Sequence, residues 1–234
     1  MHNVTIRQHI VDRVVARRGD IHWFTELDPR TSALVIVDMQ NTFCLPGAPG
    51  EVPEAREIVP AINDLAARMR DLGVPVIWVL HTNSQSDGVS DWEVFFNHVV
   101  RNPDVKKRMV DSLAPENQKV WDDLIVEEQD TVIIKNRYSA LAHGSSNLER
   151  VLRSRGIDTV LVGGTKTNVC CDSTARDAMM LDFKSVMISD CCAASSDDEH
   201  LASLETFIQQ FGDVMTSEEV MDRMIRRNDA AAAE

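Results

Sequence analysis

The sequence predicts an α/β protein, with three α/β/α layers around a mostly parallel sheet of about six strands. Two observations lead to this class. Short apolar runs rich in Val and Ile recur along the chain without clean polar alternation, which is typical of strands buried on both faces. Helical patterns separate the runs, so right-handed helical crossovers would join parallel strands. The 234 residues fit one domain spanning 1–234.

The elements follow in chain order from these patterns. We expect five strands and a weaker sixth, at Ala33–Val37, Pro75–Leu80, Thr131–Ile134, Thr159–Val162, Ser185–Ile188 and Gly212–Met215. We expect the intervening helices at Glu54–Leu72, Ser145–Arg155, Val169–Leu181 and Asp197–Phe211. The first two are followed directly by Gly73 and Gly156, and glycine commonly ends a helix.

Two segments depart from the alternation. Residues 1–30 are predicted to form an N-terminal helical extension, with its helix over Ile6–Arg18. Residues 81–129 are too long for a simple crossover, and they carry the aromatic side chains Trp92, Phe95 and Phe96. We expect this insert to form short helices and part of a pocket wall.

The composition excludes several classes of protein. Lys+Arg 24 against Asp+Glu 37 gives a net charge of −13, which argues against nucleic acid and against an anionic membrane surface as partners. No apolar run approaches the roughly 20 residues of a membrane-spanning helix. The first residues carry scattered charges and no apolar core of a secretory signal, so we expect a cytoplasmic protein with five reduced cysteines.

An acid, a base and a thiol follow three of the predicted strands. Asp38 follows the first strand, Lys135 the third, and Cys170 lies in the turn after the fourth. Because ligands of open parallel sheets bind beyond the carboxyl ends of the strands, the three side chains would converge on one crevice. Taken singly, Asp38 suits a helix cap, Lys135 a solvated strand end, and Cys170 a buried apolar position. Together they favour a site, because unpaired charge is costly among buried strands.

The three side chains suit acyl transfer through a thioester. We expect the pKa of the Cys170 thiol to be lowered by the first turn of a helix and by the Lys135 ammonium. Asp38 would take the thiol proton and return it to a leaving amine. Backbone N–H groups of the same turn would hold the oxyanion.

Three stretches resemble the motifs of the isochorismatase-like cysteine hydrolases. They read ALVIVDMQNTFC, IIKNRYSA and GGTKTNVCCDSTARDA, and the resemblance runs from about Thr31 to Thr216. Within the family the chain is most similar to ureidoacrylate amidohydrolases and to hydrolases of small linear amides of the biuret and triuret type. The resemblance implies that Asp38, Lys135 and Cys170 are catalytic and that Cys171 points into the core.

The resemblance also implies the chemistry around the nucleophile. It implies a cis peptide bond between Thr165 and Lys166, and an oxyanion hole formed by the N–H groups of Lys166 and Cys170. The metal motif D-x-H-x-x-H of nicotinamidases is absent, since residues 81–88 read HTNSQSDG, so we expect no metal and no cofactor. Isochorismatases that cleave a vinyl ether lack the cysteine, so Cys170 is typical of the amide hydrolases. Members are commonly oligomers, which implies a homodimer or homotetramer.

Six residues are candidates for binding substrate: Gln40, Asn41, His81, Asn83, Tyr138 and Thr167. Gln40 and Asn41 would bond Asp38 or the substrate, or merely begin the loop after the strand. Tyr138 lines the pocket by resemblance. Ureidoacrylate-type relatives have paired aromatics where this chain has Leu141 and Ala142, so we expect a less bulky and more polar pocket wall.

These observations favour a metal-independent cysteine amidohydrolase that cleaves a small linear amide, ureide or carbamoyl compound and releases ammonia or a small amine. Two other classes stay open. An aspartyl-phosphate phosphatase would use an acid at this position, although Gln40 stands where such enzymes have a second Asp. A non-catalytic binding protein of the same fold is the second alternative.

Overall fold

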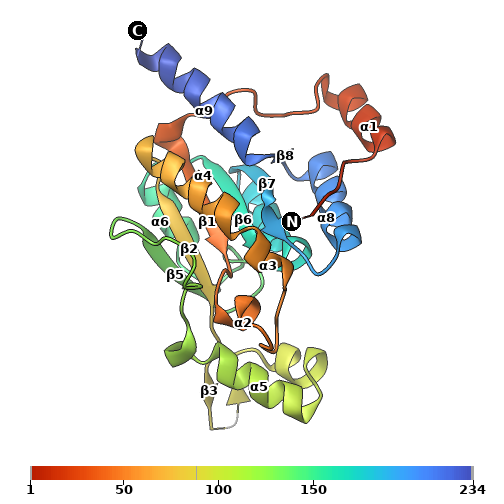
Figure 1. Ribbon diagram of the computed structural model, residues 1–234, viewed down its shortest axis with the longest axis vertical. Helices are drawn as coiled ribbons and strands as arrows, with labels where there is room; N and C mark the ends of the chain where they lie inside the picture. The colour runs from red at the N-terminus through yellow and green to blue at the C-terminus, as the bar shows by residue number, and fades with distance from the viewer. Residues whose placement is uncertain (1, 88, 233–234) are drawn as a thin grey trace.

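The computed structural model describes residues 2–87 and 89–232, with side chains up to residue 224. Its centre is a six-stranded sheet in the order β5-β2-β1-β6-β7-β8, in which every neighbouring pair is parallel (Figure 1). The predicted fold class and all six predicted strands are therefore confirmed. The strands are β1 (Ser32–Val37), β2 (Val76–His81), β5 (Thr131–Lys135), β6 (Thr159–Thr165), β7 (Lys184–Ala193) and β8 (Asp213–Met215).

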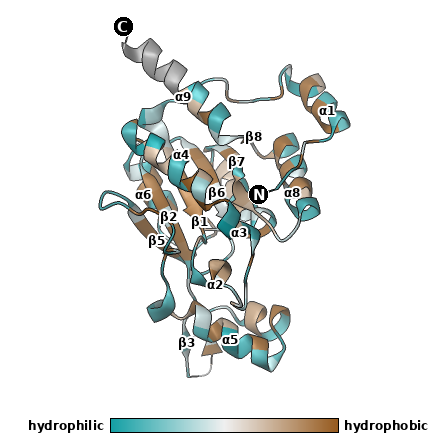
Figure 2. Cartoon of the chain, in the orientation of Figure 1, coloured by the Kyte–Doolittle hydropathy of each residue, from teal (hydrophilic) through white to brown (hydrophobic). Residues whose placement is uncertain are grey.

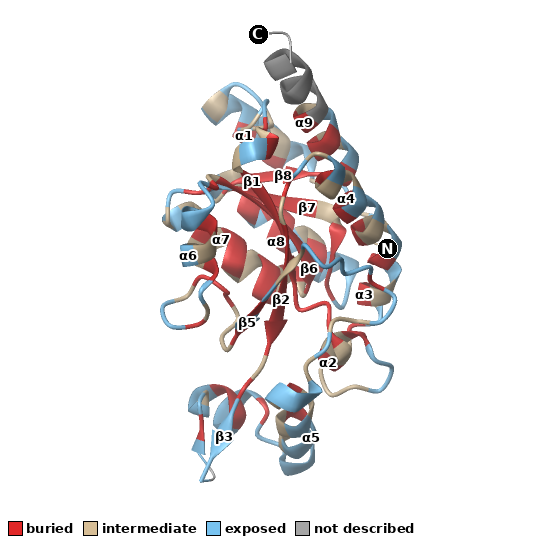
Figure 3. Ribbon diagram, turned by 90° about the vertical axis from the view of Figure 1, so that its left-hand side faces the viewer, coloured by how far each residue is buried: buried red, intermediate tan, exposed pale blue. Residues whose placement is uncertain are grey.

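Helices cover both faces of the sheet and bury an apolar core on each. In β1, Val35 and Val37 face one core while Leu34 and Ile36 face the other, so the strand is buried on both sides. Figure 2 shows apolar strands between helices of mixed hydropathy, and Figure 3 shows the central strands of the sheet buried. At the edge of the sheet, Val132 and Ile134 of β5 are exposed, so this strand is not buried on both faces as expected. One face carries α1 (Gln8–Arg18), α6 (Leu148–Ser154), α7 (Asp172–Met180) and α8 (Asp197–Gln210). The other carries α3 (Glu54–Glu57), α4 (Val59–Asp71) and α9 (Ser217–Ala232).

Most predicted elements agree with the structure to within three residues at each end, and two differ by more. The helix expected over Glu54–Leu72 is broken at Ile58 into α3 and α4. Pro60 explains the break, because it has no N–H to donate to the carbonyl of Arg56 one turn earlier. The strand expected at Ser185–Ile188 continues through Ala193, past a shift in the register between β7 and β6.

The segment 81–129 lies beyond the carboxyl end of β2 (Figure 1). It contains a two-stranded antiparallel pair, a π-helical turn, one regular helix and a short 3-10 helix. These are β3 (Gln85–Ser86), β4 (Val89–Ser90), η2 (Phe95–Val99), α5 (Pro103–Leu113) and η3 (Pro115–Asn117). Phe95, Phe96 and Leu113 belong to a third apolar cluster, while Leu124 near the end of the segment packs in the core covered by α4.

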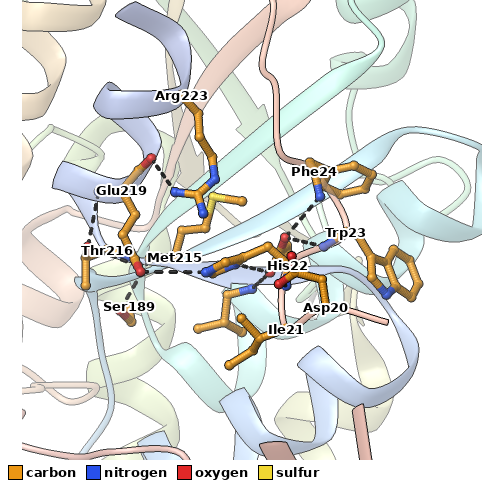
Figure 4. A network of polar contacts seen from close by, with 12 residues as sticks. Asp20, Ile21, His22, Trp23, Phe24, Ser189, Met215, Thr216, Glu219 and Arg223 are labelled. Carbon is orange, nitrogen blue, oxygen red and sulfur yellow. Dashed lines mark hydrogen bonds and ion pairs between the residues drawn. The ribbon is translucent and has the colours of Figure 1, made fainter. Parts of the chain in front are cut away.

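The N-terminal extension is anchored to the amino end of β8. The buried Asp213 carboxylate accepts hydrogen bonds from the His22 ring at 2.9 Å and from the amides of Trp23 at 2.8 Å and Phe24 at 3.2 Å (Figure 4). The amide of Val214 also donates to it, at 2.9 Å. A buried carboxylate needs such donors, so these contacts hold the connector after α1 against the sheet.

Two short elements flank β1: η1 (Pro29–Thr31) before it and α2 (Asn41–Cys44) after it. Among the described ranges, no helix combines the length and apolar character needed to cross a membrane.

Candidate active site

The carboxyl edge of the sheet brings the three predicted catalytic side chains together. Asp38 directly follows β1, Lys135 is the last residue of β5, and Cys170 lies in the π-helical turn η4 (Thr167–Cys171) that leads into α7. One ligating atom from each of Asp38, Cys170 and the neighbouring His81 falls within 4.8 Å of the others. Convergence at this edge follows from the parallel sheet, because β1, β5 and β6 all point the same way.

The local backbone at this edge is unusual in three places. Asp38 adopts a left-handed conformation with φ 56°, and its N–H donates to the carbonyl of Val79 at 2.8 Å. The peptide bond between Thr165 and Lys166 is cis, as the resemblance implied. Gly164 has φ 114°, and a Cβ there would lie 2.0 Å from the carbonyl oxygen of Val37. Only glycine therefore lets β6 approach β1 directly below the site.

Lys135 connects the acid to the rest of the site. Its side chain is fully buried, and its ammonium donates to Asp38 Oδ2 at 2.9 Å, to His81 Nδ1 at 3.2 Å and to the carbonyl of Arg137 at 3.0 Å. Burial lowers the pKa of Lys135, but the charge of Asp38, the neighbouring Cys170 and the hydrogen bonds to both together raise the pKa overall. All three ammonium protons have acceptors, so Lys135 is a charged and fixed partner of Asp38.

His81 continues the network away from the ammonium. Burial, with the nearby charge of Lys135, holds the pKa of His81 well below its usual value, so the ring is neutral at pH 7. An ammonium only donates, so Nδ1 accepts, and the ring proton on Nε2 donates to Asn83 Oδ1 at 2.9 Å. The amide of Asn83 donates in turn to Asp91 Oδ1 at 2.8 Å and to the carbonyl of Asn136 at 3.3 Å. His81 and Asn83 thus orient Lys135.

Cys170 is buried beside Asp38, and its pKa differs from our expectation. Burial and the neighbouring Asp38 charge raise the pKa of the thiol, and the Lys135 charge offsets them only in part. The expected lowering of this pKa is therefore wrong, and the thiol is protonated in the resting site. Burial also raises the pKa of Asp38, against the attraction of Lys135. Within the described residues, Asp38 Oδ1 is buried and has no hydrogen-bond partner, so one carboxylate oxygen is open to receive a proton.

The cluster of Asp38, His81 and Cys170 has the residue types of a metal site. However, Lys135 donates to both Asp38 Oδ2 and His81 Nδ1, and Asn83 engages the other ring nitrogen. A cation would have to displace the ammonium from the lone pairs that would bind it. The donor set therefore fits a metal poorly.

A cavity of about 200 Å³ opens onto Cys170. Side chains from the carboxyl edge of the sheet and from the segment 81–129 line it. They are Phe43, His81, Phe95, Val99, Val100, Met109, Leu113, Tyr138, Lys166, Val169 and Cys170. Trp92 lies behind this wall, with its ring centroid 4.7 Å from that of Tyr138 and 5.7 Å from that of His81.

The expectation of a more polar wall is wrong, because the wall comes from a different part of the chain. Leu141 packs into the core that faces α6 and α7, and neither it nor Ala142 lines the cavity. The apolar lining of the segment 81–129 was not identified residue by residue from the sequence. The sequence did predict that this segment forms part of a pocket wall, because it is too long for a crossover and carries several aromatic side chains.

Of the six residues predicted to bind substrate, His81 and Tyr138 line the cavity and four do not. Asn83 bonds His81, as described above. Gln40 is buried and exchanges two bonds with the backbone of His81, at 2.6 Å and 2.9 Å, which tie the loop after β1 to β2. Asn41 begins α2, away from the cavity. Thr167 is buried and bonds the ring of His200 at 2.8 Å.

The turn around the nucleophile is held by its own backbone. The amides of Val169 and Cys171 both donate to the carbonyl of Lys166, at 3.1 Å each. Cys171 is fully buried, and its thiol lies 3.7 Å from the carbonyl of Gly163. Its predicted place in the core is confirmed, and Cys170 is the thiol of the pair that borders the cavity.

Comparison with known proteins points to one family. Residues 32–219 match the family model described as the isochorismatase domain. Enterobactin synthase component B of Escherichia coli K12 is 32% identical over 218 residues, which cover 93% of this chain and 71% of that protein. A ureidoacrylate amidohydrolase of Methylobacterium radiotolerans is 29% identical over 212 residues, covering 83% of this chain and 81% of that protein. A crystal structure of a cysteine hydrolase from Pseudomonas syringae has a TM-score of 0.73 and 31% identity, covering 86% of this chain and 95% of that one.

Proposed function

Because this chain belongs to the isochorismatase family, we propose that it is a metal-independent cysteine amidohydrolase that cleaves the C–N bond of a small amide through a thioester. One observation carries the proposal. The buried Asp38 has one oxygen fixed by Lys135 and the other without a partner in the described structure, beside the Cys170 thiol that opens onto the cavity. An acid placed between a fixed cation and a thiol suits proton transfer.

The first half-reaction forms the thioester. Asp38 accepts the thiol proton while Cys170 Sγ bonds to the carbonyl carbon of the substrate. We assign the oxyanion to the N–H groups of Lys166 and Cys170. The intermediate collapses when the C–N bond breaks and Asp38 returns its proton to the departing nitrogen, so that ammonia or an amine leaves.

The second half-reaction hydrolyses the thioester. Asp38, again a carboxylate, takes a proton from water as the hydroxyl oxygen bonds to the acyl carbon. The C–S bond then breaks, the carboxylic acid leaves, and the proton returns to Cys170 Sγ. Lys135 stabilises the carboxylate form of Asp38 at the start of each half-reaction. The raised pKa of Asp38 makes this carboxylate a better proton acceptor than an exposed one.

The two alternative functions have less support. An aspartyl-phosphate phosphatase needs a second carboxylate two residues after the first, and here Gln40 occupies that position and bonds the backbone of β2. A binding protein without activity has no need for a buried ammonium–carboxylate pair beside a thiol, since burying such charges is costly.

Ammonia release tests the proposal. We would compare wild type, Cys170→Ala and Cys171→Ala on ureidoacrylate, biuret, N-carbamoyl amino acids and simple carboxamides, with EDTA present. Turnover should survive EDTA, disappear in Cys170→Ala, and persist in Cys171→Ala, because the second thiol points into the core. Both variants remove one buried thiol, so they are matched in their cost to stability. Loss of activity in Cys171→Ala alone, or no release from any compound, would contradict the proposal.

A further inference from the structure

The cavity beside Cys170 is small and its walls are apolar. Seven of its eleven lining residues have apolar side chains: Phe43, Phe95, Val99, Val100, Met109, Leu113 and Val169. Its volume of about 200 Å³ compares with the ~150 Å³ of an apolar cavity that accepts one benzene molecule. There is room for an amide group and a compact hydrocarbon group of about the size of one ring.

The cations near the cavity are already engaged. The three protons of Lys135 go to Asp38, His81 and Arg137, so none remains for a substrate carboxylate. The ammonium of Lys166, which lines the cavity, lies 4.0 Å from the Glu199 carboxylate.

Two further groups near the cavity also offer no charge to an anion. The ring of His81 is neutral at pH 7, because burial and the nearby charge of Lys135 hold its pKa well below the usual value. The Arg137 guanidinium does not line the cavity, and it donates to the carbonyls of Asn136 at 2.7 Å and Asp91 at 2.9 Å. A carboxylate entering this cavity would lose its hydration and meet one cation only, Lys166, whose ammonium already faces the Glu199 carboxylate, so the loss would be poorly offset. The net charge of −13 also disfavours the approach of anions.

We propose that the substrate is an uncharged amide whose remaining part is a compact apolar group, seated among Phe95, Val99, Met109 and Leu113. This inference rests on the proposed hydrolase function and narrows its substrate class. It separates the chain from hydrolases whose substrates carry a carboxylate beside the amide, such as the ureidoacrylate amidohydrolase to which it is similar.

A matched pair of substrates tests the charge preference. Crotonamide and fumaramate share the same amide and double bond, and differ by a methyl group in place of a carboxylate. We expect kcat/KM of wild type for crotonamide to exceed that for fumaramate by on the order of a hundredfold, because the carboxylate must be desolvated without a partner. Butyramide and succinamate differ in the same way, and kcat/KM of wild type should likewise be higher for butyramide than for succinamate.

A matched pair of variants tests where the preference arises. Val99 lines the cavity and is 64% exposed, while Val94 is 67% exposed and outside the cavity. Both sites tolerate a long polar side chain at little cost to folding. Val99→Arg should raise kcat/KM for fumaramate relative to crotonamide by about tenfold, since it offers the missing cation. Val94→Arg adds the same charge outside the cavity and should leave that ratio unchanged.

The outcomes separate this inference from the function on which it rests. Hydrolysis of fumaramate at least as fast as crotonamide, and lost in Cys170→Ala, would overturn the neutral-substrate inference and leave the hydrolase function standing. An equal change of the ratio in both arginine variants would overturn the assignment of the preference to this cavity. No hydrolysis of any amide would overturn both proposals.

Discussion

Replacing Lys135 with methionine tests how the buried ion pair of Lys135 and Asp38 contributes to stability and activity. The substitution keeps a long unbranched side chain and removes the ammonium that donates to Asp38 Oδ2 at 2.9 Å. Both side chains of the pair are fully buried, and Asp38 Oδ1 already has no partner in the described structure. The variant would therefore hold a buried carboxyl group without a cation. Removing one partner of a buried pair typically costs about 3–5 kcal/mol of the free energy of unfolding.

The loss in free energy of unfolding caused by Lys135→Met should increase with pH. Burial raises the pKa of Asp38 in the folded protein, and Lys135 opposes that rise. Without Lys135 the pKa of Asp38 rises further, so the folded variant binds a proton at pH values where wild type does not. The folded state is then stabilised relative to the unfolded chain at low pH, and this contribution is lost as pH rises through the raised pKa. The destabilisation relative to wild type should be smaller at pH 5 than at pH 8.

Urea unfolding at pH 5 and pH 8 measures both quantities. We expect Lys135→Met to lose about 3–5 kcal/mol at pH 8 and to have no hydrolytic activity, because no cation then stabilises the carboxylate form of Asp38. The double variant Asp38→Leu with Lys135→Met removes the unpaired carboxyl group and should recover much of the lost stability. A Lys135→Met protein as stable as wild type at pH 8, or one destabilised more at pH 5, would refute this reasoning.

Two further substitutions test the supports of the site and of the fold. Gly164→Ala should cost more than about 1 kcal/mol of stability and most of the activity, because its φ of 114° disfavours any side chain and the new Cβ would lie 2.0 Å from the Val37 carbonyl oxygen. Thermal unfolding and ammonia release would measure this, and an unchanged midpoint would contradict it. Asp213→Ala should cost about 3 kcal/mol, since it leaves the His22 ring and three amides without their acceptor. Activity per folded molecule should survive, as Asp213 lies at the opposite edge of the sheet from Cys170; a loss of activity in fully folded protein would count against this separation.

The sequence by itself determined the fold class and the convergence of Asp38, Lys135 and Cys170 at one edge of the sheet. Strands of a parallel sheet are apolar without clean alternation, so all six strands could be predicted from the local sequence. The edge strand β5 shares this pattern although Val132 and Ile134 are exposed. Parallel strands share one carboxyl edge, so the position of Asp38, Lys135 and Cys170 after three such runs was enough to predict that they meet. The placement of Cys171 in the core was implied by the resemblance to the isochorismatase-like hydrolases, and the structure confirms it.

Three features were decided only by the tertiary structure. The pKa of Cys170 depends on how completely the thiol is buried and on which charge lies nearest, and neither can be read from a helix position; the structure raises the pKa that we expected to be lowered. Gln40, Asn83 and Thr167 have polar side chains that could have faced a substrate, yet each is engaged by a neighbour distant in sequence.

The apolar wall of the cavity is the third such feature. It is formed largely by the segment 81–129, in which the π-helical turn that carries Phe95 and Val99 is too short to show a period in the sequence. Local patterns determine which face of an element is buried. Which distant side chains share a buried space, and so set the charge and polarity of the site, is fixed only when the whole chain packs.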